Sequence, residues 1–110
     1  GMFSNTASGT FELEVNCGGL TIEDNESSYF KISGNAATLN VNFYDGNARF
    51  DGSNLIADQV HCFQRSSNDI IVNPITKISG TIYSSGNIIL KNTPSTIEVT
   101  QLYQGHLIYP

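Results

Sequence analysis

The feature that most constrains the fold is a short sequence motif that recurs about every 19 residues. A glycine or another small polar residue is followed by two apolar residues at alternate positions, first in "SGTFEL" (8–13) and last in "QGHLIY" (104–109). The anchors of the six copies are Gly9, Ser28, Gly46, Asn68, Gly86 and Gly105, separated by 19, 18, 22, 18 and 19 residues. An internal period of this length is typical of solenoid proteins, in which each repeat forms one coil.

A second set of apolar pairs gives the same period independently. The pairs are Leu20/Ile22, Leu39/Val41, Val60/Cys62, Ile78/Gly80 and Ile97/Val99, separated by 19, 21, 18 and 19 residues. Both sets place one insertion near residues 51–58. The repeat therefore has two apolar segments per coil, and the third coil is longer than the others.

Apolar and polar residues alternate within each unit, which indicates strands, and no segment has the spacing of an amphipathic helix. The sequence thus predicts an all-β, single-stranded, right-handed parallel β-helix of about five coils of 18–22 residues plus a partial sixth. The rival is a left-handed hexapeptide helix, which the 22-residue step disfavours. The residues expected to stack inside are Phe11, Phe30, Ala48, Ile70, Ile88 and Leu107.

Length and charge limit the classes of function. A chain of 110 residues predicts one domain, here 8–110, preceded by residues 1–7 as a cloning scar, an N-terminal cap or a flexible lead. The net charge of −5 disfavours nucleic acid as a partner. No transmembrane segment and no signal peptide are seen in the sequence, although an export signal could have been removed.

The segment "NFYDGNARFDGSNLIADQVHCFQRSSNDIIVNPITKISGTIYSSGNIILKNTP" (42–94) resembles the putative auto-transporter adhesin, head GIN domain family. The likeness lies in the order and spacing of the turns that open each strand, which only approximate the family's Ser-Gly-Ser-Gly-Asp pattern. A further departure is Asn92, which stands where the family has a glycine before Pro94. The resemblance implies a secreted, periplasmic or cell-surface protein, a shortened or C-terminal portion of the family's domain, with adhesion as its role. It supplies no catalytic residues.

The main alternative is a carbohydrate-active β-helix, which needs acids stacked on neighbouring coils. The expected outward column is Glu12, Lys31 and Arg49, followed two positions later by Glu14, Ser33, Asp51, Asn73 and Lys91. Mixed charges of this kind indicate a ladder of weak surface ion pairs. We therefore expect a non-catalytic module without a cofactor.

Metal and thiol chemistry are also disfavoured by the residue positions. Glu23, Asp24 and Glu26 form the one acidic cluster and are a weak calcium candidate, but a solvated turn is the preferred interpretation. His61 and His106 fall at different positions of the repeat, so we expect no zinc site. The two cysteines, Cys17 and Cys62, should lie two coils apart and stay unpaired.

Three tyrosines and three asparagines are the candidate binding residues. Tyr44, Tyr83 and Tyr103 lie close before successive anchors and are either glycan contacts on an exposed face or packing groups beneath the turns. Asn16, Asn35 and Asn54 recur near one corner and are expected to form a hydrogen-bonded ladder, with a glycan-contacting strip as the alternative. The partner is expected to be a glycan or a surface protein, and an uncovered end coil could pair with a second copy.

Overall fold

The computed structural model describes residues 2–5, 9–24 and 27–110, which form strands and loops without a helix. The strands are β1 (Met2–Asn5), β2 (Gly9–Asp24), β3 (Ser28–Phe43), β4 (Arg49–Gln64), β5 (Ile70–Ile82), β6 (Ile88–Leu90), β7 (Thr96–Gln101) and β8 (Leu107–Ile108). All paired strands run parallel, so the predicted β-solenoid of about five turns is confirmed. No helix long and apolar enough to cross a membrane occurs among these residues.

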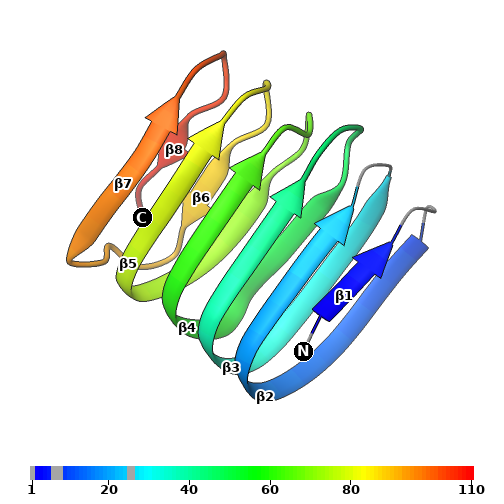
Figure 1. Cartoon of the computed structure of the whole chain (residues 1–110), viewed down its shortest axis with the longest axis vertical. Coiled ribbons are helices and arrows are strands. Elements are labelled where there is room, and N and C mark those ends of the chain that lie inside the picture. Colours follow the sequence, from blue (N-terminus) through cyan, green and yellow to red (C-terminus); the bar gives the residue numbers. More distant parts are fainter. Residues whose placement is uncertain (1, 6–8, 25–26) are drawn as a thin grey trace.

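Each of β2 to β5 is a long strand that bends halfway and places its two halves in different layers, whereas the following coil is divided into β6 and β7 (Figure 1). The first layer contains the first halves of β2 to β5 together with β6 and β8. The second layer contains the second halves of β2 to β5 together with β1 and β7. The sequence predicted separate short strands, but β2 and β3 stay paired around the bend, where Val15 faces Gly34 and Cys17 faces Ala36. Between β2 and β3 the bend falls at the same register and pairing continues through it, whereas the β3–β4 and β4–β5 pairs shift register there.

The space between the two layers is filled by the apolar positions of the repeat. The ladder Leu20, Leu39, Val60, Ile78 and Ile97 pairs in register across five coils, as the sequence predicted. The largest side chains that are almost wholly buried include Phe30, Phe43, Phe50, Ile70, Ile78, Ile82 and Ile88. Period-two alternation thus places one apolar side of each strand in the core and leaves the other side to solvent.

The predicted register is wrong in the third coil. Phe30 faces Phe50, and Phe50 faces Ile70, so Phe50 occupies the stacking position that was assigned to Ala48. Phe43 and Phe50 are separated by seven residue steps, whereas Gln64 and Ile70 are separated by six, so this loop contains one extra residue. The loop moves the anchor glycine out of register with the strand that follows it.

A bulge explains the insertion predicted near 51–58. Between the pairs Lys31/Asp51 and Gly34/Leu55, β3 advances three residues and β4 advances four. The Asp51 carboxylate accepts hydrogen bonds from Ser53 N at 3.1 Å and Ser53 Oγ at 2.7 Å. The extra residue is therefore accommodated as a bulge that a side chain of the same strand stabilises.

Two anchor glycines of the repeated motif, Gly86 and Gly105, lie where neighbouring loops approach closely. Gly86 N donates to Ser66 O at 3.1 Å, and a Cβ at position 86 would lie 2.1 Å from Asn68 O. Only glycine allows this approach. Gly105 lies equally close to Gly86 O, so at these two anchors glycine lets each coil fit closely onto the loop of the coil before it.

One buried polar side chain joins two of these loops. The Gln64 amide nitrogen donates to Asn68 O at 2.8 Å and to Asn87 O at 3.1 Å, and its oxygen accepts from Ser66 Oγ at 2.7 Å. Gln64 occupies the register position of Phe43 in the preceding coil. Its amide is satisfied on both sides, as a fully buried polar group requires.

Candidate functional site

The most prominent exposed aromatic group lies at the loop end of the second layer. Tyr44, Phe63 and Tyr83, here called the aromatic strip, come from three successive coils. The ring centroids of Tyr44 and Phe63 are 5.6 Å apart, and those of Phe63 and Tyr83 are 5.0 Å apart. Tyr44 is 44% exposed and Tyr83 is 45% exposed, so ring surface remains open to solvent.

Register explains why Phe63 completes the strip. Tyr44 N donates to Asp24 O, Arg65 N donates to Phe43 O and Tyr83 N donates to Gln64 O, so Arg65 is the equivalent of the two tyrosines. Phe63 lies two residues before Arg65 on β4, and its ring bridges the rings on either side.

A hydrogen bond orients the first ring of the strip. The Tyr44 hydroxyl donates to Glu23 Oε2 at 2.8 Å. This hydrogen bond, followed by partial burial and the nearby negative charge, raises the pKa of Tyr44. The phenol therefore stays protonated and remains a donor to Glu23 at neutral pH.

Tyr103 does not take the register position that the sequence suggested. Leu102 N donates to Ile82 O, which makes Leu102 the equivalent of Tyr83. Tyr103 is 63% exposed and has no ring contact with the other described aromatic residues. The structure thus joins Tyr44 to Tyr83 and leaves Tyr103 outside the strip.

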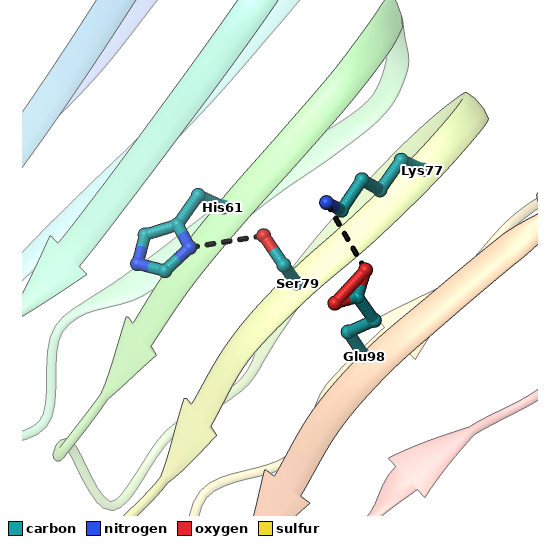
Figure 2. Close-up of polar contacts among 4 residues, drawn as sticks. All are labelled: His61, Lys77, Ser79 and Glu98. Carbon is teal, nitrogen blue, oxygen red and sulfur yellow. Dashed lines mark hydrogen bonds and ion pairs between the residues drawn. The ribbon is translucent and has the colours of Figure 1, made fainter.

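A polar surface continues from the aromatic strip along the second layer. His61 and Phe63 are two residues apart on β4 and so point to the same side of the sheet. In Figure 2, His61 Nδ1 and Ser79 Oγ are hydrogen-bonded at 3.0 Å, and Lys77 Nζ pairs with Glu98 Oε1 at 3.1 Å. A shallow hollow of about 120 Å³ is lined by Thr38, Leu39, Asn40, Gln59, Val60, His61, Lys77 and Ser79. This surface offers hydroxyl, amide and imidazole groups beside the rings.

The outward charge column of the first layer differs from the prediction. Glu12 faces Lys31 and Lys31 faces Asp51, so Asp51 takes the third position of this column, where Arg49 was expected. Asp51 is therefore not in the column of Glu14 and Ser33, to which the sequence assigned it. A lysine therefore stands between the two acids of this column. These side chains, with the bulge, line a hollow of about 330 Å³.

The Asp51 carboxyl group remains ionised in this hollow. Partial burial alone would raise the pKa of Asp51, but the side-chain and backbone hydrogen bonds of Ser53 and the charges of Arg49 and Lys31 together lower it. A general acid in glycoside cleavage needs a raised pKa. Asp51 is therefore poorly suited to that role.

The predicted asparagine ladder is interrupted. Asn16 faces Asn35, but Asn35 faces Ile56, and Asn54 lies in the bulge instead. The continuous ladder of three asparagines was wrong because the bulge after Asp51 moves Asn54 away from the position opposite Asn35. Asn16 and Asn35 remain an exposed pair at the bend.

The other sequence candidates are distributed differently. Of the acidic cluster, Glu23 binds Tyr44, Asp24 is buried, and Glu26 lies outside the described residues. Among the described residues, no group of three or more His, Cys, Asp or Glu is arranged to hold a metal. Cys17 and Cys62 are unpaired thiols as predicted, and burial raises the pKa of Cys62 to about 12.

Comparison with known proteins identifies a family for the chain. No curated protein and no solved structure matches the chain. The family model described as putative auto-transporter adhesin, head GIN domain, matches residues 2–94, which include β1 to β6. With this match over most of its length, the chain belongs to the putative auto-transporter adhesin, head GIN domain family.

Proposed function

We propose that this protein is a non-catalytic, adhesin-like surface module that binds glycans through the aromatic strip. The observation that carries the proposal is the row of three rings, two of them nearly half exposed, on three successive coils. The family name supports adhesion and a location at the cell surface. Glycans are a natural ligand class for an exposed row of rings on a polar face.

Aromatic rings bind sugars because the C–H side of a sugar ring is apolar while its hydroxyl groups need hydrogen-bond partners. Tyrosine satisfies both requirements, with an apolar ring and a polar end. The neighbouring side chains of Asn40, His61 and Ser79 supply donors and acceptors on the same face. An extended oligosaccharide could therefore contact successive rings while its hydroxyl groups reach the polar hollow.

The solenoid also makes the site rigid. Each ring is attached next to a strand that is paired on both sides, as β4 is with β3 and β5. Little conformational entropy is then lost when a ligand binds, which favours a preformed platform.

A catalytic role has weaker support. The His61–Ser79 pair could suggest a base and a nucleophile, but Glu98, which faces Ser79, pairs with Lys77. In a catalytic triad, the acid would orient the histidine. We therefore propose binding without turnover.

The proposal is tested by glycan-array binding of the purified chain with and without Ca²⁺, together with an assay for reducing sugar or unsaturated product released from every glycan that binds. Calcium-independent binding without product release is the expected result. Product release would overturn the non-catalytic role, and the absence of binding to any glycan would overturn the ligand class.

A further inference from the structure

An unpaired arginine lies in a hollow on the first layer, at the other end of the loop that carries Tyr44. The hollow has a volume of about 310 Å³ and is lined by Thr10, Ser27, Ser28, Tyr29, Asn47, Arg49 and Asn68. We call it the Arg49 hollow. Among the residues that the structure describes, no acid lines it, although the whole chain has a net charge of −5.

The Arg49 guanidinium group lacks the partner that such a group normally has. Its Nε is buried without a hydrogen bond, and no ion pair joins Arg49 to any described carboxylate. Its Cζ lies 5.6 Å from the centroid of the Tyr29 ring, which supports one side of the group. Because Nε itself is shielded from solvent, a ligand in the hollow would meet the terminal guanidinium nitrogens, for which the described residues supply no hydrogen bond.

The two carboxylates nearest along the strands are engaged elsewhere. Asp51 lies two residues after Arg49 and accepts from Ser53. Asp69, beside Arg49 in the next coil, accepts weakly from Asn87 N at 3.4 Å. Neither carboxylate forms an ion pair with Arg49 in the described part of the chain, although the Arg49 charge is one of the causes that lower the pKa of Asp51.

We infer that the Arg49 hollow binds the carboxylate of an acidic sugar. Guanidinium binds carboxylates through two parallel hydrogen bonds, and the other lining groups are hydroxyls, amides and one aromatic ring, which suit the remainder of a sugar. This inference rests on the proposed glycan binding and adds the sugar class.

The charge of the whole chain makes the inference easy to test. A net charge of −5 repels acidic ligands, so without a local cationic site the protein should prefer neutral glycans. The probes are matched pairs on one array: oligouronates with their methyl esters, and sialylated with desialylated oligosaccharides. We expect stronger binding of the acidic member and a roughly tenfold loss of its affinity in Arg49→Gln, with a partial loss in Arg49→Lys.

Two further variants keep the test specific. Lys91→Gln removes the same charge from an exposed position outside the hollow and should leave the preference intact. Arg65→Gln removes the cation beside the aromatic strip. If Arg65→Gln abolishes the acidic preference and Arg49→Gln does not, the inference is wrong.

The outcomes also separate this inference from the proposed function. Equal binding of both members of every pair would overturn the carboxylate site and leave the aromatic strip standing. Binding of acidic glycans that is unchanged in Arg49→Gln, with the melting temperature preserved, would also overturn it. The absence of all glycan binding would overturn both proposals.

Discussion

Two groups of aromatic rings in this molecule have similar spacing and opposite exposure. In the core, the ring centroids of Phe30 and Phe43 are 6.0 Å apart and both side chains are fully buried. In the aromatic strip, Tyr44 and Tyr83 flank Phe63 at 5.6 and 5.0 Å and are nearly half exposed. Ring spacing alone therefore does not distinguish a core contact from a binding surface; the side of the strand does.

Phe43 and Tyr44 show this most clearly because they are consecutive residues. The first ends β3 and points into the core, and the second begins the loop and points outward. If the two groups have different roles, substitutions in the core should affect stability and substitutions in the strip should affect binding.

The largest effect is expected for Phe43→Ala. Removal of a fully buried phenylalanine ring should lower the free energy of unfolding by about 3–5 kcal/mol. Urea denaturation followed by circular dichroism measures this change. A loss below about 1 kcal/mol would mean that the inner rings do not hold the coils together.

The next effect concerns the buried thiol and depends on pH. The unfolded Cys62 thiol loses its proton near pH 9, but the folded thiol keeps it until about pH 12. Because its folded pKa is raised, its stabilising contribution is complete below pH 9 and falls by a few kcal/mol toward pH 12. Denaturation between pH 8 and 11 should therefore show a steeper loss of stability in the wild type than in Cys62→Ala. Parallel curves would contradict this burial.

A smaller stability effect is expected for Tyr44→Ala. The ring is 44% exposed and loses only its contact with Phe63 and its bond to Glu23, so the cost should be about 1 kcal/mol. The same urea titration provides the comparison with Phe43→Ala. If Tyr44→Ala lowered the free energy of unfolding as much as Phe43→Ala does, Tyr44 would contribute to stability like a core residue, and the contrast between the two groups would be lost.

The smallest effect is expected for Glu23→Gln. Without the carboxylate that accepts the hydrogen bond of the phenol and places a negative charge beside it, the pKa of Tyr44 should decrease toward its ordinary value. An NMR titration of ¹³C-labelled tyrosine, compared between the wild type and Glu23→Gln, would follow the phenol. An unchanged pKa would show that the hydrogen bond does not orient this ring in solution.

The repeat predicted most of the fold because its apolar positions are dictated by the core. The register of Leu20, Leu39 and Val60 was read correctly, since each coil needs an apolar side chain at that position. Ala48 was wrongly assigned to the stacking position of Phe50 because the segment "GNARF" contains two apolar residues at alternate positions. Sequence period alone cannot choose between them, whereas ring volume in the core favours Phe50.

The sites were less predictable because they depend on small departures from the repeat. One extra residue in the loop 44–48 and the bulge after Asp51 shifted the expected positions of Arg49 and Asn54. The column of Thr10, Tyr29 and Arg49 appears only once that shift is known. The repeat did not identify Phe63 as a binding residue, because its bridging position depends on side-chain direction, which the period does not give.

The central claim is that the aromatic strip binds the ligand, and calorimetric titration of the best array glycan tests it most directly. Tyr44→Ala and Tyr83→Ala should each weaken binding roughly tenfold. Tyr103→Ala, an equivalent change at an exposed tyrosine outside the strip, should leave the affinity unchanged. Affinity that is unaffected in the two strip variants, or reduced equally in Tyr103→Ala, would contradict the account.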